Sequence, residues 1–330
     1  MDSFKAFVVE REGDIAKSGI REFRYEELPP GELLIRVSYS SVNYKDALAC
    51  SPKGNVAKIN PLVPGIDLAG VVVSTEDAAY AEGDEVIVTS YGLGVSHFGG
   101  YSEYARVPSE WAVMLPKGLT LKEAMIYGTA GFTAGMSVLA LRENGIVPER
   151  GPVLVTGATG GVGSVSVAIL AKLGYEVVAS TGKMDAADEL IGLGANRVID
   201  REELVPQVSR SLDRQLWSGA VDCVGGKTLA TVLSTLHYGG AVAASGLTGG
   251  TELATTVFPF ILRGVRLIGI DSVFAPMAER RRVWELLASE YKPEALSTLS
   301  SEIGLDEVPS ALSALLAGQS RGRVVVKIRE

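Results

Sequence analysis

The stretch "LVTGATGGVGSVSVAILAKLGYEVVASTGK" runs from Leu154 to Lys183 and decides how the rest of the chain is interpreted. A short apolar run leads into small residues, a segment with helical apolar spacing follows, and a second apolar run comes next. This order predicts a strand, a glycine loop, a helix and a second strand, which together form the repeating unit of a parallel sheet.

The glycines of this stretch stand where such a unit would bind a ligand. Gly160 and Gly161 would allow a pyrophosphate to approach the backbone, and Gly163 would allow the helix to pack closely on the strand. The start of the helix offers free N–H groups to phosphate oxygens. A tight turn without a ligand is the alternative, but five further strands in the same pattern favour a dinucleotide-binding loop.

The end of the second strand selects between the two nicotinamide dinucleotides. An acidic residue there would bind the ribose 2′-hydroxyl of NAD. The strand instead ends with Ser180, Thr181, Gly182 and Lys183. Hydroxyls and a cation suit a 2′-phosphate, so the sequence favours NADPH, with Arg197 as a second cation for the same pocket. An ordinary exposed loop lysine is the alternative reading of Lys183.

Composition limits the class of protein. The chain has 330 residues, enough for two domains, and 31 basic against 39 acidic residues give a net charge of −8. This charge argues against non-specific binding to nucleic acid. The sequence lacks a signal-peptide pattern and an apolar run of the ~18 residues that span a bilayer, so we expect a cytoplasmic protein. Two cysteines and two distant histidines offer no paired ligands for a structural zinc ion.

The regions on either side of the glycine loop predict two kinds of domain. Residues 4–107 contain short strand-like runs between turn signals, which indicate a small barrel or sandwich. A helix with a glycine break is expected at 121–144, and the last strand, at 323–328, is expected to rejoin the barrel. Alternating strands and helices predict a parallel sheet covered on both faces. Its strand candidates are 152–157, 175–181, 197–200, 220–225, 241–246 and 265–270.

Seven motifs spread over the chain form a specific set. They are SVNYKDALA (41–49), PGIDLAGVV (64–72), VTSYGLGVSHFGGYSEYARVP (88–108), GTAGFTAGMSV (128–138), the glycine-loop stretch (155–183), LGAN (193–196) and RGRVVVKI (321–328). With these motifs the chain resembles the medium-chain dehydrogenase/reductase superfamily, and within it the zinc-free YhdH/YhfP branch. That branch comprises quinone oxidoreductase-like proteins and NADPH-dependent acrylyl-CoA reductases.

The resemblance implies an α/β fold with two domains. A GroES-like β-barrel catalytic domain would comprise residues 1–122 and 273–330, and a Rossmann domain with a doubly wound parallel sheet would comprise 123–272. Relatives of this kind pair through an edge strand, and 265–270 is the candidate edge, so we expect a homodimer. The implied cofactor contacts are Tyr44, Thr159, Gly160, Gly161, Val162, Thr181, Gly182, Lys183, Arg197, Leu247, Ile261 and Ser272.

A nicotinamide enzyme without a metal needs a substrate that is itself electrophilic, and an activated alkene is one. Hydride adds to the carbon β to a carbonyl, charge moves to the carbonyl oxygen, and a proton reaches the α-carbon. The expected site of the catalytic groups is the stretch that begins with Asn43 and Tyr44. Tyr44 would bind the nicotinamide ribose or donate the proton, or it would only pack, and Asn43 would orient the substrate.

Asp67 is an acid inside an apolar run, where a carboxylate needs a partner. A catalytic and a structural role fit it equally, and the same two roles are open for Tyr91. The sequence therefore predicts an NADPH-dependent reductase of an α,β-unsaturated carbonyl, an acrylyl-CoA-like thioester or a quinone. A non-catalytic NADPH-binding sensor or redox reservoir is the alternative. A thioester of coenzyme A would need nearby cations, and the sequence does not place the candidates Lys53, Lys58, Arg263 and Arg266.

Overall fold

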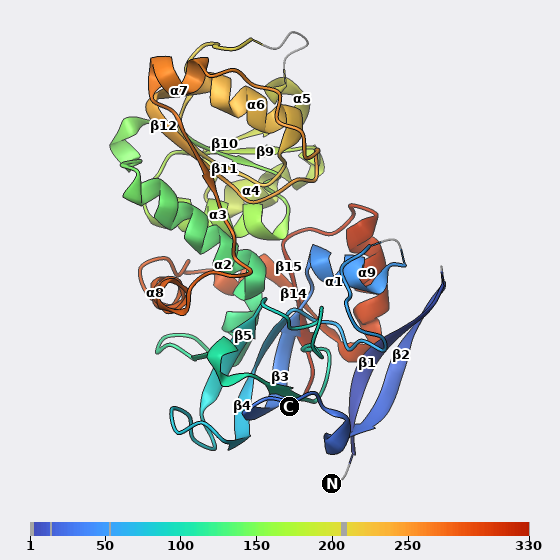
Figure 1. Ribbon diagram of the computed structural model, residues 1–330. Helices are drawn as coiled ribbons and strands as arrows, with labels where there is room; N and C mark the ends of the chain where they lie inside the picture. The colour runs from blue at the N-terminus through green and yellow to red at the C-terminus, as the bar shows by residue number, and fades with distance from the viewer. Residues whose placement is uncertain (1–2, 14, 53, 206–209, 330) are drawn as a thin grey trace. The chain divides into compact units, whose positions relative to one another are not determined.

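The computed structural model describes residues 3–13, 15–52, 54–205 and 210–329, and these residues form two units (Figure 1). The first unit contains the described residues up to Thr129, the segment Val273–Ala288 and the described residues from Ala295 onward. The second contains Ala130–Ser272 and Ser289–Glu294. The domain bounds expected from the sequence differ in placing residues 123–129 in the second unit and 289–294 in the first.

The second unit is built on a six-stranded parallel sheet whose strands follow the order β10-β9-β8-β11-β12-β13. After β10 the chain returns to the other side of β8, so β8 and β11 flank the switch point at which such sheets bind dinucleotides. All six strand candidates are confirmed, although β11 and β12 begin and end earlier than expected. The strands are β8 (Val153–Thr156), β9 (Val177–Thr181), β10 (Arg197–Asp200), β11 (Trp217–Asp222), β12 (Leu236–Ala244) and β13 (Arg266–Gly269).

Helices lie on both faces of this sheet, with α6 on one face and α3 on the other (Figure 1). Continuous apolar runs fill the strands because both of their faces are covered, and residues such as Leu154, Ala220 and Val242 are fully buried. The Rossmann architecture predicted from the sequence is thus confirmed. The helices are α3 (Gly161–Lys172), α4 (Ala187–Gly192), α5 (Arg201–Leu204), α6 (Gly226–Thr235) and α7 (Phe258–Arg263).

The first unit contains a seven-stranded sheet and a two-stranded hairpin. Strand β15 pairs with β3, which confirms that the last strand rejoins the N-terminal region. Three strands of this unit, β2, β7 and β14, were not predicted. The residues of β2 are mostly exposed and lack an apolar alternation. The strands are β1 (Ser3–Glu12), β2 (Ile15–Arg24), β3 (Leu33–Ser41), β4 (Asp67–Thr75), β5 (Glu85–Thr89), β6 (Tyr104–Val107), β7 (Ala112–Met114), β14 (Ser300–Gly304) and β15 (Arg323–Lys327).

Three helices belong to this unit alone: α1 (Tyr44–Cys50), α8 (Met277–Ala288) and α9 (Val308–Leu316). A fourth helix, α2 (Leu121–Glu143), carries the expected glycine break, because Gly128 has the non-helical angles φ +50° and ψ −156°. By length and hydropathy α2 could cross a membrane, but 89% of its most apolar 18-residue window is buried inside the protein. We therefore assign it as a core helix.

Candidate functional site

The glycine loop connects β8 to α3 at the carboxyl end of the sheet. Gly157 has a φ of +60°, and a Cβ on Gly163 would collide with the backbone of Gly157 and Ala158. Gly160 is the N-cap of α3, where no side-chain cap hydrogen bond forms among the described residues, and the first turn contains no acidic residue. This helix end is therefore free to bind an anion, as the sequence predicts.

Hydroxyls join this loop to the end of β9. The Oγ1 atoms of Thr159 and Thr181 are 3.1 Å apart, and the Lys183 N–H donates to Thr181 Oγ1 at 3.0 Å. Ser180 is only 1% exposed, and its carbonyl accepts the N–H of Ala158 at 3.0 Å. Ser180 therefore supports the glycine loop through its buried backbone, whereas Gly182 and Lys183 form the turn that follows β9.

A different arginine from the expected one lies beside this turn. In the pairing of β10 with β9, Arg197 stands opposite Val178, and Asp200 stands opposite Thr181. Arg197 is thus about 10 Å along the strand from the carboxyl end, and its guanidinium carbon lies 6.0 Å from the ring centre of Trp217. The structure therefore does not place Arg197 with Lys183.

Arg201, the first residue of α5, is the arginine that packs over Gly182. A Cβ built on Gly182 would lie 2.7 Å from Arg201 Nε and 2.9 Å from its Cζ. The sequence contained a usable signal, because Arg201 directly follows the strand predicted at 197–200. The carboxyl ends of neighbouring parallel strands meet at one edge, and this rule selects Arg201 over Arg197.

A buried carboxylate supports the loop from the other side of the switch point. Asp222, the last residue of β11, accepts hydrogen bonds from Thr156 Oγ1 and from the Gly225 N–H, both at 2.7 Å. Burial raises the pKa of Asp222. The side chain thereby ties the start of the glycine loop to the turn that opens α6.

The remaining expected cofactor contacts of the second unit follow later elements. Leu247 lies after β12 and is 63% exposed, and Ile261 lies on α7 and is 68% exposed. Ser272, after β13, is 8% exposed, and its Oγ accepts a hydrogen bond from Thr133 Oγ1 at 2.8 Å. Leu247 and Ile261 therefore offer apolar surface, whereas Ser272 is held by its neighbour.

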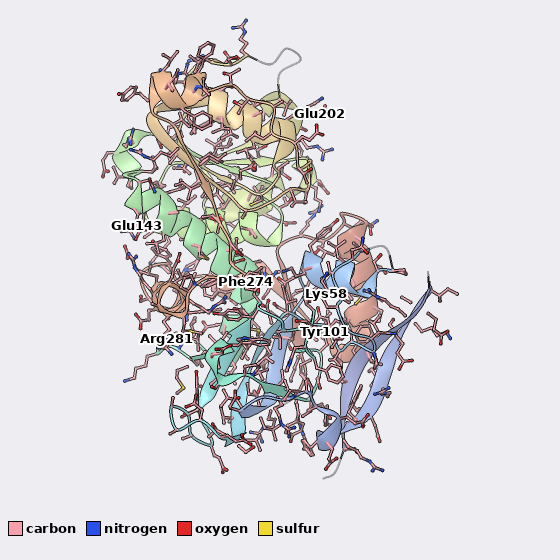
Figure 2. The ribbon with its side chains drawn as sticks, in the orientation of Figure 1. Lys58, Tyr101, Glu143, Glu202, Phe274 and Arg281 are labelled. Atoms are coloured by element: carbon pink, nitrogen blue, oxygen red, sulfur yellow. The ribbon has the colours of Figure 1, made fainter. Side chains whose placement is uncertain are left out.

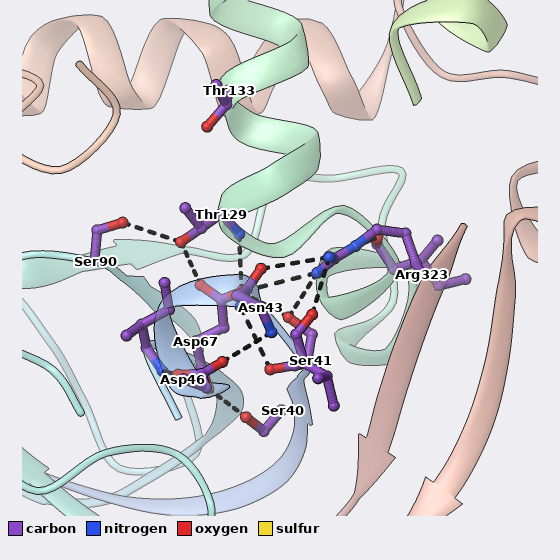
Figure 3. A network of polar contacts seen from close by, with 12 residues as sticks. Ser40, Ser41, Asn43, Asp46, Asp67, Ser90, Thr129, Thr133 and Arg323 are labelled. Carbon is purple, nitrogen blue, oxygen red and sulfur yellow. Dashed lines mark hydrogen bonds and ion pairs between the residues drawn. The ribbon is translucent and has the colours of Figure 1, made fainter. Parts of the chain in front are cut away.

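In the first unit, a buried polar network surrounds Asp67 (Figure 3). Its Oδ2 accepts from Ser41 Oγ at 2.6 Å, from Asn43 Nδ2 at 2.7 Å and from the Thr129 N–H at 2.9 Å. Its Oδ1 accepts from Thr129 Oγ1 at 2.5 Å. Asp67 is 0% exposed and its acceptor sites are occupied, so the geometry argues against a catalytic Asp67 and for a structural carboxylate.

Arg323, at the start of β15, supplies the positive charge of this network. Its Nη2 lies 4.0 Å from Asp67 Oδ2 and donates to Ser41 Oγ at 2.9 Å. Its Nη1 lies 3.3 Å from Asn43 Oδ1, and its Nε donates to the carbonyl of Ile126 at 2.9 Å. Burial lowers the pKa of Arg323, and Asp67 opposes this shift. Sequence reasoning missed Arg323, although an arginine that opens the final apolar strand was a signal.

A second buried carboxylate, Asp46, fixes the first turn of α1. It accepts the Asn43 N–H at 2.9 Å, the Ile66 N–H at 2.9 Å and the Tyr101 hydroxyl at 3.2 Å. Burial, reinforced by repulsion from Asp67, raises the pKa of Asp46 to about 7. Burial also raises the pKa of Tyr101, a side chain labelled inside the first unit in Figure 2.

Asn43 and Tyr44 therefore have different environments. Asn43 is 8% exposed, and both ends of its amide are engaged by Asp67 and Arg323, so it has no free group to orient a substrate. Tyr44, the first residue of α1, is 49% exposed. Tyr44 is therefore an exposed aromatic residue that directly follows a residue held by the network around Asp67, namely Asn43.

The other sequence candidates occupy structural positions. Tyr91 stacks on Trp111 with ring centres 5.8 Å apart, and its hydroxyl donates to the Ala275 carbonyl at 3.2 Å. Arg263 donates to three backbone carbonyls, and Arg266 stands at the amino end of β13, away from the glycine loop. Lys58 is exposed, and Lys53 lies outside the described residues. Among the described residues, no group of three or more His, Cys, Asp or Glu side chains could hold a metal ion.

Two protein families match the chain. Residues 29–117 match the alcohol dehydrogenase GroES-like domain, and residues 161–289 match the zinc-binding dehydrogenase family. YhfP of Bacillus subtilis, which carries a quinone oxidoreductase name, is 54% identical over 98% of this chain and 99% of its own. AcuI of Ruegeria pomeroyi, an acrylyl-CoA reductase, is 47% identical over 98% of this chain and 99% of its own.

Solved structures give the same result. The crystal structure of YhfP with NAD bound has a TM-score of 0.98 over 99% of this chain and 100% of that chain. The YhdH oxidoreductase from Salmonella enterica in complex with NADP is 46% identical and has a TM-score of 0.96, over 98% of this chain and 100% of that chain. The chain is therefore an oxidoreductase of the medium-chain dehydrogenase/reductase superfamily and belongs to its YhdH/YhfP family.

Proposed function

We propose that the protein is an NADPH-dependent reductase of activated alkenes, with an acrylyl-CoA-like thioester or a quinone as substrate. The observation that carries the cofactor choice is the turn at Thr181–Lys183. It contains no acidic residue, Lys183 belongs to it, and the Arg201 side chain packs over Gly182. Two cations and a hydroxyl suit a 2′-phosphate, which NADH lacks.

Solved relatives hold either cofactor, so the choice depends on this chain's own residues. YhfP was crystallised with NAD and YhdH with NADP. In our proposal the pyrophosphate binds at Gly160–Val162, where the first N–H groups of α3 have no side-chain cap. Lys183 and Arg201 bind the 2′-phosphate, and Arg197 has no part in this contact.

When bound, NADPH supplies the hydride that adds to the β-carbon of the substrate. The protein then has to hold the substrate, stabilise the developing oxyanion and provide a proton at the α-carbon. We assign the proton to the Tyr44 hydroxyl, because this side chain is exposed at the start of α1 and a phenolic O–H group is a hydrogen-bond donor. Hydrogen bonding to the nicotinamide ribose is the alternative role for Tyr44.

Asn43 and Asp67 act through Tyr44 in this proposal. Their side chains form a hydrogen bond of 2.7 Å with each other. Arg323 bonds the other end of the Asn43 amide, and Thr129 bonds the other oxygen of Asp67. A fully engaged, buried pair cannot touch substrate, but it fixes the backbone at which α1 begins. We therefore assign both as positioning residues and keep the catalytic role for Tyr44.

The mechanism requires no metal, and we propose that the protein works without zinc, in the cytoplasm, on a small molecule. The decisive experiment mixes the protein with NADPH and either acrylyl-CoA or a panel of quinones and follows absorbance at 340 nm, with and without prior treatment with a chelator. We expect NADPH oxidation that survives chelation. Binding of NADPH without any oxidation would favour a sensor or redox reservoir, and activity that returns only with added zinc would refute metal independence.

A further inference from the structure

Two neighbouring residues at the end of β5 adopt a backbone conformation that side chains disfavour. Ser90 has a φ of +65° and Tyr91 a φ of +49°. In this left-handed region the Cβ crowds the following carbonyl oxygen, so two consecutive non-glycine residues there store strain. Strain of this kind persists only where the surrounding structure imposes it, and it concentrates at functional sites.

Arg280 of α8 contacts the residues on either side of Ser90. Its side chain is fully buried, and its Nη1 donates to the Thr89 carbonyl at 3.2 Å and to Thr89 Oγ1 at 2.8 Å. Its Nε donates to the Tyr91 hydroxyl at 3.2 Å. The Ser90 N–H adds a further bond, to the Ile66 carbonyl at 2.7 Å. These contacts hold the strained residues from both sides.

The turn places the Ser90 hydroxyl against the network around Asp67 (Figure 3). Ser90 Oγ lies 3.0 Å from Thr129 Oγ1 and is almost completely buried. Thr129 Oγ1 has one proton, and it donates that proton to Asp67 Oδ1 at 2.5 Å. Ser90 must therefore be the donor to Thr129, which leaves Thr129 a single orientation.

We propose that the strained Ser90–Tyr91 turn is a positioning device for catalysis and that Ser90 is a further positioning residue. Ser90 donates to Thr129, Thr129 donates to Asp67, Asp67 accepts from the Asn43 amide, and Asn43 precedes Tyr44 at the start of α1. The inference rests on the proposed function, in which Tyr44 delivers the proton. The inference explains why position 90 is a serine, although a glycine would adopt this backbone conformation without strain.

Glycine at position 90 separates this proposal from a purely structural role. Ser90→Gly removes the hydroxyl but relieves the backbone strain, so we expect an equal or higher Tm. Loss of one neutral hydrogen bond should lower kcat about three- to tenfold, with the KM for NADPH unchanged. Ser90→Ala also removes the hydroxyl but keeps the strain. It should show the same reduced kcat as Ser90→Gly, with a Tm below that of the wild type. Asn55→Gly is the matched control, because Asn55 is an exposed residue with a φ of +51°.

Amide hydrogen exchange completes the test and does not depend on turnover. The Thr129 amide should exchange faster in Ser90→Gly than in the wild type, while amides of β8 should be unchanged. Two results in the Ser90→Gly variant would overturn the proposal. One is a kcat equal to that of the wild type, and the other is a reduced kcat together with a reduced Tm. If the wild type reduces no substrate, the proposed function fails, and unchanged exchange at Thr129 would then separately reject the positioning role.

Discussion

Tyr44 is exposed, while the side chains next to it in the network are buried, and this contrast makes its hydroxyl testable on its own. Tyr44→Phe keeps the ring and removes only the oxygen. If Tyr44 donates the proton, kcat should fall by ~10²–10⁴-fold, the usual contribution of general acid catalysis, with little change in the Kd for NADPH. Single-turnover kinetics and a fluorescence titration measure the two quantities.

The same variant distinguishes the other roles of Tyr44. Weaker NADPH binding with a smaller loss of kcat would assign the hydroxyl to the ribose. If neither quantity changes, Tyr44 only packs, and water becomes the proton source.

Lys183 and Arg201 should act on the 2′-phosphate alone. Replacing either by Ala should weaken NADPH binding by ~1–3 kcal/mol, the size of a hydrogen bond to a charged group, and leave NADH binding nearly unchanged. Arg197→Ala is the matched control, because Arg197 lies beside Trp217 and not beside Gly182. Isothermal titration calorimetry with each cofactor measures both binding free energies. Equal losses of binding free energy for NADPH and NADH would contradict the assignment.

Asp46 should make stability depend on pH. Its pKa rises from 3.8 to about 7 in the folded protein, so between these values the native state holds a proton that the unfolded chain releases. The contribution of this group is complete below pH ~4, and it is lost as pH rises to ~7, at up to about 1.4 kcal/mol per pH unit. Urea unfolding from pH 4 to 8 should show a flatter pH dependence in Asp46→Asn, and parallel curves would reject the shift.

The polar network around Asp67 packs against the helix α2 at its break, Gly128. Gly128 has a φ of +50°, and a Cβ there would collide with Asp67 Oδ2 and lie 2.8 Å from Arg323 Nη2. Gly128→Ala should therefore destabilise the protein by about 3 kcal/mol or more, as breaking a buried ion pair does, and should lower kcat. Gly192→Ala is the matched control, because the Cβ at Gly192, in α4, would meet open space. Denaturant unfolding of both variants checks this, and equal stabilities would contradict it.

Assembly concerns the edge of the parallel sheet. Strand β13 is the last strand in the order and pairs only with β12 among the described strands, and Leu267 on it is 38% exposed. Exposed apolar residues on α7 lie in the same region of the chain, so we expect a homodimer formed along this edge. Light scattering should give about twice the 34.7 kDa monomer mass. Leu267→Glu should give monomers, whereas Ile20→Glu, an exposed position on β2, should not; a wild-type monomer at micromolar concentration would contradict the prediction.

The architecture of the second unit followed from local patterns. Apolar runs of strand length, helical spacing and the glycines at 157–163 are properties of neighbouring residues, so the six strands and the glycine loop before α3 could be predicted directly. The same reasoning located the glycine break in α2 and the return of the last strand. It failed for β2, β7 and β14, and the exposed, charged residues of β2 gain their conformation from pairing with β1.

The partners of the polar side chains were decided only by the tertiary structure. The sequence indicated that Asp67 needs a partner, because an unpaired buried carboxylate is unstable. It did not identify Arg323 as that partner, since the contact joins residues far apart in the chain. The choice of Arg201 over Arg197 required the register of β10 on β9, and the strain at Ser90 required the contacts of Arg280. Periodicity encodes which residues are buried, whereas long-range packing determines which of them meet.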